Sequence, residues 1–418
     1  MSDPARVLLQ RLFEVAVAAA DPMVCLGPHL PLPPAGCTLV LGAGKAAASM
    51  ARAVEQNWPA AMEGLVVTRY GHGVPTSHIE VVQAAHPVPD AAGEAAAGRI
   101  LAMAGKLGPD DLLLVLISGG GSSLLSLPSP GLSLADKQAV NQALLRSGAP
   151  IDQMNVVRKH LSAIKGGWLA AAAAPAQVVS LLISDVPGDD PAIIASGPTV
   201  ADPSTFAEAR DILARYRIEP PRAVARHLAA AEQETPKPGD RLFERCRTIL
   251  IATPGGSIAA AAEMATAAGY QVKLLGDDLE GEARELGAEH GRLALLRQSS
   301  GGRLALLSGG ETTVTVRGNG RGGRNVEYLA GLALALGGRP GISALAGDTD
   351  GIDGTEDNAG AFVLPDTLRR AATVGIDPGT LLANNDAHGL FSALDDLLIC
   401  GPTLTNVNDF RVILIDPV

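Results

Sequence analysis

Two stretches in the last third of the chain concentrate residue types that could do chemistry. The first, Ser308 to Ala330, places Glu311, Arg321 and Arg324 close together among glycines. An arginine in a glycine-rich loop suits phosphate or carboxylate binding, because the guanidinium fork matches the anion and glycine lets the backbone come close. This stretch therefore predicts an anion site.

The second stretch, Ala346 to Val363, is acidic. It carries five carboxylates: Asp348, Asp350, Asp353, Glu356 and Asp357. Clustered carboxylates suit Mg²⁺, which takes hard oxygen ligands and often shares them with substrate phosphates. Solvated turns are the alternative, since Gly, Asp and Asn are ordinary turn residues. Taken together, the two stretches favour chemistry on a phosphorylated ligand.

A third candidate site follows a strand-like run near the amino terminus. Residues Leu39–Met50, LVLGAGKAAASM, are typical of a strand, a turn at Gly44 and a helix. The backbone N–H groups and the helix dipole of such a turn attract anions, and Lys45 adds a mobile positive charge that could reach a phosphate. The turn is not a Walker A loop, because Ala46 stands where Ser or Thr would bind Mg²⁺.

The same turn loosely matches the dinucleotide fingerprint at Gly42, Gly44 and Ala47. In that fold an acidic residue closes the second strand and holds the ribose of NAD. Arg69 stands there instead, and it would tolerate only the 2′-phosphate of an NADP-type cofactor. An NADPH-dependent reductase therefore stays open as an alternative function.

A second glycine-rich turn follows the apolar run Asp111–Ser118. Its sequence, SGGGSS, offers N–H and O–H donors for a phosphate or a carboxylate. Three consecutive glycines are costly in a purely structural turn, because glycine loses the most conformational freedom on folding. We expect the residues of this turn to bind substrate: Ser118, Gly119, Gly120, Gly121 and Ser122.

Two further segments carry charge. Asp189 lies after the strand-like run Gln177–Ser184, where a carboxylate can hold Mg²⁺ or act as a general base on a hydroxyl. Residues Asn155–Ala170 are expected to form one helix, in which Arg158 and Lys165 share a basic face. A solvated face explains these cations equally well.

The composition indicates a globular protein. Of its 418 residues, 47% are hydrophobic and 18% are charged, which allows two or three domains with sizeable cores. The net charge of -11 argues against nucleic acid or an anionic membrane as a partner. The four cysteines are scattered without a C-x-x-C pair, which fits a reducing cytoplasm. Residues 1–20 are expected to form an amphipathic helix and not a targeting segment.

Short apolar runs alternate with Ala-rich segments along the chain, which predicts α/β domains built on parallel sheets. The polar segment Glu234–Asp240 contains two prolines and indicates a boundary. We therefore expect two α/β domains, over residues 1–236 and 240–418, with a cleft between them. The strands within 386–418 could belong to either domain, and Thr312–Val316, TTVTV, is expected to be a strand.

Seven segments together resemble the glycerate 2-kinase family, some of whose members carry the name hydroxypyruvate reductase and whose carboxyl-terminal part is called the MOFRL domain. They occur in family order over nearly the whole chain, and one departure is Leu404, where a small residue would be expected. The segments are GAGKAA at Gly42, HPVPD at His86, SGGGSSLL at Ser118, VRKHLSAIKGG at Val157, SDVPGDDPAIIASGPT at Ser184, SGGETTVTVRGNGRGGRN at Ser308 and AGDTDGIDGTEDNAGA at Ala346.

The resemblance implies ATP-dependent phosphorylation of the 2-hydroxyl of D-glycerate to 2-phosphoglycerate, with a divalent metal. It also implies a Rossmann-like amino-terminal domain over residues 1–236, a smaller carboxyl-terminal α/β domain over 240–418, and an active site in the cleft between them. In that cleft, the resemblance implies that Lys45 and Arg324 stabilise charge. A sensor that binds a phosphorylated metabolite without turning it over is a further alternative, and a homodimer is compatible with the sequence.

The residue types suggest the remaining roles as hypotheses. The turn Ser118–Ser122 would cradle the glycerate carboxylate or a phosphate. Asp189, with Asp348 or Asp353, would hold Mg²⁺ or accept the hydroxyl proton. The nucleotide side would be shaped by Ser308, Gly309, Gly310, Glu311 and Asn325.

Overall fold

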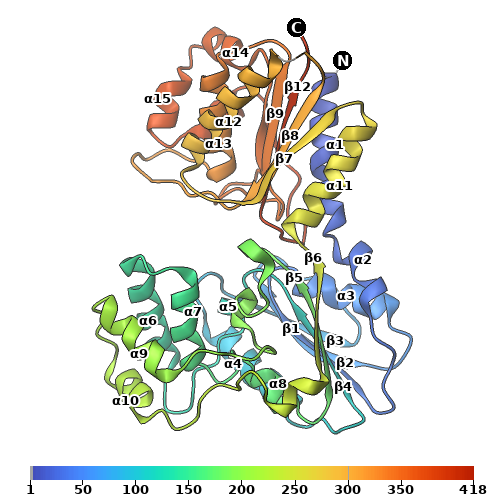
Figure 1. The fold of residues 1–418 in the computed structure, drawn as a ribbon, viewed down its shortest axis with the longest axis vertical. Coiled ribbons are helices and arrows are strands. Elements are labelled where there is room, and N and C mark those ends of the chain that lie inside the picture. The colour runs from blue at the N-terminus through green and yellow to red at the C-terminus, as the bar shows by residue number, and fades with distance from the viewer. Residues whose placement is uncertain (1–2, 300) are drawn as a thin grey trace. The chain divides into compact units, whose positions relative to one another are not determined.

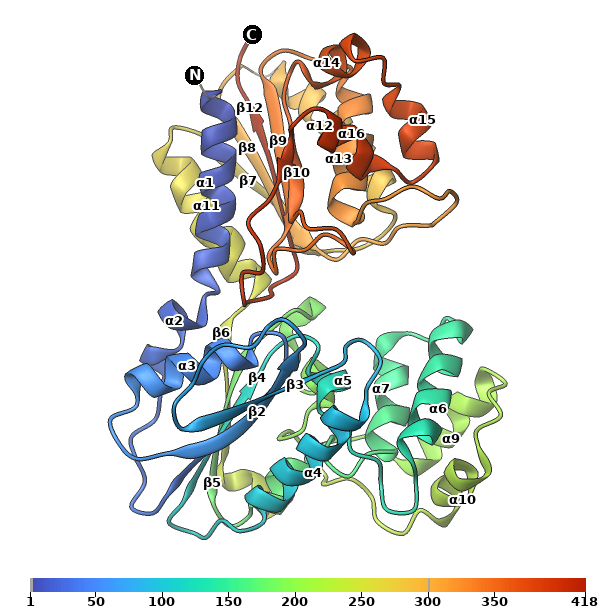
Figure 2. The same cartoon turned by 180° about the vertical axis from the view of Figure 1, so that it is seen from behind.

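The computed structural model describes residues 3–299 and 301–418, which divide into two compact units. The first unit is Pro22–Ile251, and the second unit combines the residues up to Asp21 with Ala252–Val418. Each unit has its own six-stranded sheet with helices on its faces (Figures 1 and 2). Within the described ranges, no helix has both the length and the apolar character needed to cross a membrane.

The sheet of the first unit has the strand order β3-β2-β1-β4-β5-β6, and its pairs from β3 to β5 are parallel. Both β1 and β4 are buried at every position, because a parallel sheet covered on both faces leaves no side chain in water. The strands are β1 Thr38–Ala43, β2 Glu63–Arg69, β3 Ile79–Ala84, β4 Leu112–Ile117, β5 Gln177–Ile183 and β6 Cys246–Ala252.

This strand order creates a switch point between β1 and β4. The chain builds outward from β1 through β2 and β3 on one side, and from β4 through β5 and β6 on the other. In such sheets the loops after the two central strands diverge and leave a ligand-binding crevice at the strands' carboxyl ends. Ala43 pairs with Ile117 at the ends of β1 and β4, so the turns that start at Gly44 and Ser118 lie side by side.

The helices of the first unit form two groups. Helices α4 and α8 pack on one face of the sheet, and α3 covers the other (Figures 1 and 2). Helices α6, α7, α9 and α10 pack around a separate apolar core. The helices are α2 Pro22–Cys25, η1 Gly27–His29, α3 Ala47–Asn57, α4 Ala91–Ala104, α5 Gly121–Leu124, α6 Leu134–Ser147, α7 Ile151–His160, α8 Trp168–Ala173, η2 Pro187–Asp189, η3 Ile194–Ser196, α9 Phe206–Arg215, α10 Arg222–Ala230 and η4 Arg241–Arg245.

The sheet of the second unit is mixed, with the order β11-β10-β9-β12-β8-β7. Strand β12 runs antiparallel to both of its neighbours, β8 and β9, while β7 and β8 are parallel. The start of β12 therefore lies at the same edge as the ends of β8 and β9. The strands are β7 Gln271–Leu279, β8 Leu304–Gly310, β9 Ile342–Asp348, β10 Gly360–Val363, β11 Leu397–Leu398 and β12 Asp409–Ile415.

Helices cover both faces of this second sheet. Helices α1 and α11 pack on one face, and α12 and α13 pack on the other (Figures 1 and 2). The helices are α1 Pro4–Ala19, α11 Pro254–Ala267, α12 Ala283–Gln298, α13 Arg324–Leu336, α14 Thr367–Thr373, α15 Pro378–Ala383 and α16 Ala387–Ala393.

The α/β class and the Rossmann-like first sheet are confirmed, but the division of the chain differs from the predicted one. Strand β6 lies beside β5, so the first unit extends past the polar segment Glu234–Asp240. The first helix, α1, belongs to the second unit, where it buries Leu9, Leu12 and Phe13. The last strand, β12, lies inside the second sheet, because its alternate residues fill both apolar cores of that unit.

Two predicted elements are wrong. Residues Thr312–Val316 form no strand: Thr313 makes an isolated bridge, and Thr315 is held by the Glu282 carboxylate instead of by a neighbouring strand. The single helix expected over Asn155–Ala170 is two helices, α7 and α8. Residues 161–167 separate them, and α8 begins only after Gly166 and Gly167, whose φ of 56° and 87° lie in the left-handed region that cannot continue a right-handed helix.

Candidate active site

Arg324 is the centre of a charge cluster in the second unit. The pairing of Asp409 with Asp348 across β12 and β9 brings these two carboxylates to the first residue of α13. Arg324 donates from Nε to Asp409 Oδ1 (2.8 Å), from Nη2 to Asp348 Oδ2 (2.9 Å) and from Nη1 to Glu311 Oε1 (2.6 Å). Each donor group of the guanidinium thus has its own carboxylate.

These carboxylates set the electrostatics of the cluster. Burial alone lowers the pKa of Arg324, but Asp409, Asp348 and Glu311 together raise it above its ordinary value. Asp409 has almost no exposed surface, whereas the Glu311 side chain is 50% exposed. Glu311 is therefore the partner that an incoming anion could replace at the lowest cost, since its carboxylate regains water when it leaves.

Asp353 holds the start of α13. Its two oxygens accept from the N–H groups of Asn325 (3.0 Å) and Val326 (2.9 Å), which have no partner inside the helix. A Cβ atom at Gly323 would lie 2.2 Å from Asp353 Oδ1, so only glycine allows this approach. Burial raises the pKa of Asp353 to about 6. The geometry is that of a buried helix cap that fixes the direction of Arg324.

Asp409 and Arg411 belong to this site, although neither was among the candidate residues from the sequence. Arg411, 1% exposed, donates to Asp409 Oδ2 (2.6 Å) and to the carbonyl of Gly309 (2.8 Å). Asn325 Nδ2 donates to Asp409 Oδ1 (2.8 Å). Asp409 and Arg411 together therefore tie β8, β12 and α13 to one another. The sequence did contain a signal for these two residues, namely an Asp and an Arg two positions apart at the start of an apolar strand.

The glycines at the end of β8 serve close packing as well. Gly310 has φ of 107°, and a Cβ there would lie 2.2 Å from the backbone of Leu279. Ser308 is buried and pairs in register with Arg411. The segment Ser308–Gly310 thus lies at the cluster, and Glu311 directly follows it.

A second missed group holds the loop between Arg317 and Arg321. Asn385 Oδ1 accepts from the N–H groups of Arg317 (2.7 Å) and Gly318 (3.0 Å). Asn384 and Asp386 bind the N–H groups of Asn319 and Arg321 in the same way. The polar sequence NNDAHG is therefore the support of the glycine-rich loop.

The turn after β1 differs from the expected phosphate cradle. Its N–H groups are bonded within the protein: Gly44 to Val67 O (3.0 Å), Lys45 to Gly119 O (2.8 Å) and Ala46 to Ser118 Oγ (2.9 Å). A Cβ at Gly44 would lie 2.1 Å from Ser118 Oγ, so this glycine allows the two turns to touch. The chemistry of the turn therefore rests on the side chain of Lys45.

The turn after β4 keeps donors available. In the described part of the chain, no backbone acceptor is bonded to the N–H groups of Gly119 and Gly120. Gly120 has φ of 78°, and a Cβ there would lie 3.0 Å from the His86 ring and 3.4 Å from Lys45 Cγ. Two N–H groups and the Lys45 side chain thus occur together at the switch point, as an anion site requires.

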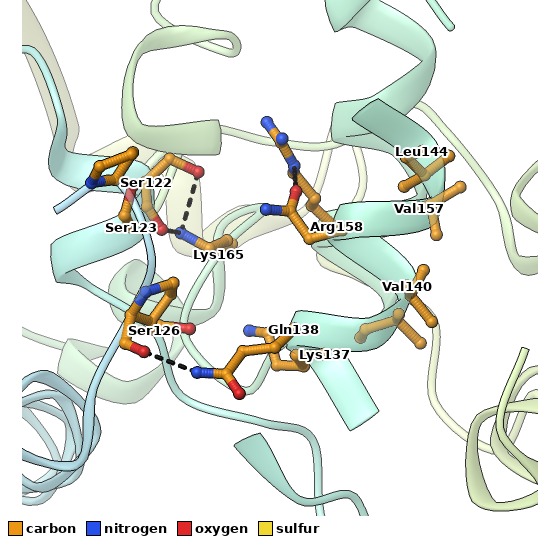
Figure 3. A pocket seen from close by; sticks show the side chains of 14 residues that line it. Ser122, Ser123, Ser126, Lys137, Gln138, Val140, Leu144, Val157, Arg158 and Lys165 are labelled. Carbon is orange, nitrogen blue, oxygen red and sulfur yellow. Dashed lines mark hydrogen bonds between the residues drawn. The ribbon is translucent and has the colours of Figure 1, made fainter. Parts of the chain in front are cut away.

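The predicted basic face is not solvated. Lys165 is 2% exposed and donates from Nζ to the carbonyl of Ser122 (2.6 Å), as Figure 3 shows. Ser122 Oγ lies 2.9 Å from Ser196 Oγ, and Ser196 donates to Asn155 (3.1 Å). This network connects the glycine-rich turn to α7 and to η3.

Asp189 lies on the segment that leads from β5 to Ser196. Its φ is 55°, and its Oδ1 is buried without a hydrogen-bond partner in the described residues. Those residues contain no group of three His, Cys, Asp or Glu side chains arranged to hold a metal. Three carboxylates were predicted to bind Mg²⁺. Both oxygens of Asp353 accept hydrogen bonds, and Asp348 pairs with Arg324. Asp189 has one oxygen without a hydrogen-bond partner in the described residues.

Comparison with known proteins agrees with both units. The family described as "Domain of unknown function (DUF4147)" matches residues 8–229, and the MOFRL family matches residues 304–409. A crystal structure described as glycerate kinase from Thermotoga maritima superimposes with a TM-score of 0.91 at 37% identity, over 98% of this chain and 99% of that chain.

Curated relatives carry two names. A protein of Agrobacterium vitis named "Putative hydroxypyruvate reductase" is 54% identical over 98% of this chain and 94% of its own length. The D-glycerate 2-kinase of Thermotoga maritima is 40% identical over 90% of both chains. From these matches, and from the two family models, the chain belongs to the glycerate 2-kinase family with a carboxyl-terminal MOFRL domain.

Proposed function

We propose that this protein is a glycerate 2-kinase, which transfers the γ-phosphoryl group of ATP to the 2-hydroxyl of D-glycerate and forms 2-phosphoglycerate. The observation that carries the proposal is the switch point of the first unit, where Lys45 lies against Gly120 in the glycine-rich turn. Relatives named as glycerate kinases support it over most of the chain.

Lys45 is the proposed charge-stabilising group of the first unit. A transferring phosphoryl group spreads negative charge over its oxygens, so catalysis is mainly positioning and electrostatic stabilisation. The ammonium group of Lys45 and the N–H groups of Gly119 and Gly120 supply positive charge and donors from fixed backbone. Ser118 contributes by holding the two turns together through its bond from Ala46 N–H.

Asp189 is the proposed general base. The acceptor hydroxyl must lose its proton as the new P–O bond forms, and a carboxylate within hydrogen-bond reach can take that proton. The buried, unpartnered Oδ1 of Asp189 is an acceptor without a donor in the described residues. A substrate hydroxyl would satisfy it.

The cluster around Arg324 is the proposed nucleotide side. We assign the phosphate contacts to Arg324, with Ser308, Gly309, Gly310 and Asn325 shaping the site around it. A phosphate oxygen that replaces Glu311 would keep every guanidinium donor bonded, since Asp409 and Asp348 remain in place.

Mg²⁺ would enter with ATP and neutralise phosphate charge. The chain's donor set fits a metal held largely by phosphate oxygens and water, because the described residues assemble no cage of three ligands. Asp189 and Asp348 are the candidate ligands in their respective units. Both oxygens of Asp353 already accept N–H groups, so we assign it to structure. The four free cysteines fit a cytoplasmic location, which we also propose.

An NADPH-dependent hydroxypyruvate reductase is the second candidate, favoured by the name of the Agrobacterium vitis relative. It requires the turn at Gly42 to present N–H groups to a pyrophosphate. The N–H groups of Gly44, Lys45 and Ala46 are bonded within the protein, and a Cβ at Gly42 would lie 2.2 Å from Leu116 O. These glycines therefore have a packing role that explains them without a dinucleotide.

A paired assay on purified protein tests the two functions. One arm supplies D-glycerate, ATP and Mg²⁺, follows ADP and identifies the phosphoglycerate isomer. The other supplies hydroxypyruvate with NADH or NADPH and follows cofactor oxidation. We expect glycerate-dependent ADP formation with 2-phosphoglycerate as product. Cofactor oxidation without ADP would replace the kinase by the reductase.

A further inference from the structure

A pocket in the first unit contains three cations. It lies beside the glycine-rich turn, and its cavity volume is about 100 Å³. Lys137 of α6, Arg158 of α7 and Lys165 line it together with Ser122 and Ser126 (Figure 3). The remaining wall is largely apolar, with Val140, Leu144 and Val157. Segments from distant parts of the sequence thus bring like charges into one small space.

Within the described residues, no hydrogen bond or ion pair joins these cations to a carboxylate, although Glu94 lies close enough to raise the pKa of Lys137. Lys165 Nζ donates to the carbonyl (2.6 Å) and the hydroxyl (3.4 Å) of Ser122, and Lys137 Nζ donates to Leu127 O (3.2 Å). Arg158 Nε donates to Asn141 Oδ1 (2.7 Å). All of these acceptors are neutral, so the positive charge of the pocket is not balanced by its bonded neighbours.

The two terminal nitrogens of the Arg158 guanidinium are only weakly bonded. They make only long contacts, 3.4 Å to Asn155 Oδ1 and 3.9 Å to Met154 Sδ. A guanidinium binds a carboxylate best through two parallel N–H···O bonds. The unused donors therefore match a planar anion better than a single oxygen.

Burial and the neighbouring cations disfavour the charged forms of both lysines. Burial lowers the pKa of Lys137 to about 7 and that of Lys165 well below its ordinary value, and Arg158 lowers both further. Buried cations without a counter-ion are costly, and a bound anion would restore their charge.

We propose that this pocket binds the carboxylate of the hydroxy acid that accepts the phosphoryl group, with Lys137 and Arg158 as the direct contacts. The assignment rests on the proposed function. The small volume and the apolar wall suit a three-carbon acid better than a triphosphate chain, because a triphosphate needs polar partners along its whole length. Lys165 is a positioning residue, which holds Ser122 through its hydrogen bond to the Ser122 carbonyl.

Binding of D-glycerate without nucleotide, measured by calorimetry, tests the proposal independently of catalysis. The variants are Lys137→Gln and Arg158→Gln. Arg146→Gln is the matched control, since Arg146 is exposed on the same helix as Lys137. Circular dichroism and the melting temperature establish that each variant is folded. A second arm measures inorganic phosphate in place of glycerate, which separates a carboxylate subsite from a phosphate subsite.

We expect each pocket variant to weaken glycerate binding about tenfold or more, while Arg146→Gln leaves it unchanged. In turnover, KM for glycerate rises more than kcat falls, and KM for ATP is retained. Folded variants with wild-type glycerate affinity would overturn the proposal and leave the kinase function standing. Phosphate affinity that depends on these residues while glycerate affinity does not would overturn it as well. If no ADP forms, residue-dependent glycerate binding still supports the subsite.

Discussion

Arg324 Nε lies 2.8 Å from Asp409 Oδ1, although 85 positions separate the two residues in the chain. The antiparallel position of β12 between β8 and β9 makes this contact, since it places Asp409 opposite Asp348. Asp409 also accepts from Arg411 and Asn325. The arginine is therefore held by a carboxylate that is itself immobilised from two other sides.

Arg324→Ala is expected to lower kcat with glycerate and ATP more than a hundredfold, which corresponds to about 3 kcal/mol in activation free energy. The reason is that the substitution removes the guanidinium charge that stabilises the transferring phosphoryl group. The variant also leaves Asp409 without its Arg324 partner, so its melting temperature must be recorded. Arg324→Lys keeps the charge but loses the fork, and we expect intermediate activity. Near-normal kcat in the alanine variant would remove Arg324 from the mechanism.

Lys45→Ala is expected to cost a similar factor in kcat, while the hydrogen bonds of the turn's N–H groups keep the turn in place. The matched control is Arg52→Ala, an exposed cation on the following helix. Steady-state kinetics with both substrates provide the measurement. Equal losses in the two variants would show that Lys45 has no specific role.

Gly323→Ala is expected to reduce activity without touching a substrate, because its Cβ would displace the Asp353 carboxylate that orients α13 and Arg324. Gly98→Ala is the control, as Gly98 lies in α4 with no heavy atom nearer than 3.9 Å to the added Cβ. There alanine should stabilise the helix by up to about 1 kcal/mol. Retained kcat in Gly323→Ala would contradict the cap assignment.

The pKa of Asp353 predicts a pH dependence of stability. Its folded pKa of about 6 lies above the unfolded value of 3.8, so the folded state binds more protons between pH 4 and pH 6. The contribution of this group to stability is therefore present below pH 4 and is lost, by about 3 kcal/mol, as the pH rises through 6. The unfolding free energy of the wild type should fall relative to that of Asp353→Asn over this range. Parallel curves for the two proteins would contradict the shift.

Glycerate affinity should fall between pH 6 and pH 9. Burial lowers the pKa of Lys137 to about 7, Glu94 raises it and Arg158 lowers it further, so Lys137 loses its charge over this interval. Calorimetry of the wild type and of Lys137→Gln at both pH values measures the effect. The variant should show the weaker pH dependence, and identical ratios in the two proteins would assign the change to another group.

Local patterns predicted the parts of this protein that depend on neighbours in sequence. The buried strands β1 and β4 and the turns at Gly44 and Ser118 follow from continuous apolar runs that end in glycine. The same alternation predicted α/β domains on parallel sheets, and the family resemblance implied the Rossmann-like first domain. The prediction of a strand at Thr312–Val316 was wrong, because the Glu282 carboxylate binds Thr315 in place of a neighbouring strand. The spacing of residues in the sequence contains no information about this distant side chain.

The sequence by itself determined which residue types were available: Lys45, Arg324, the glycine-rich turns and the carboxylates after β9. Tertiary structure alone decided what each does. In the folded chain Asp353 caps a helix, and Asp409 binds Arg324. The fold also places Lys137, Arg158 and Lys165 around one pocket. The physical reason is that charge and hydrogen bonding act over a few ångströms in space. Whether a polar residue is solvated, structural or chemical therefore depends on partners that only the fold brings near.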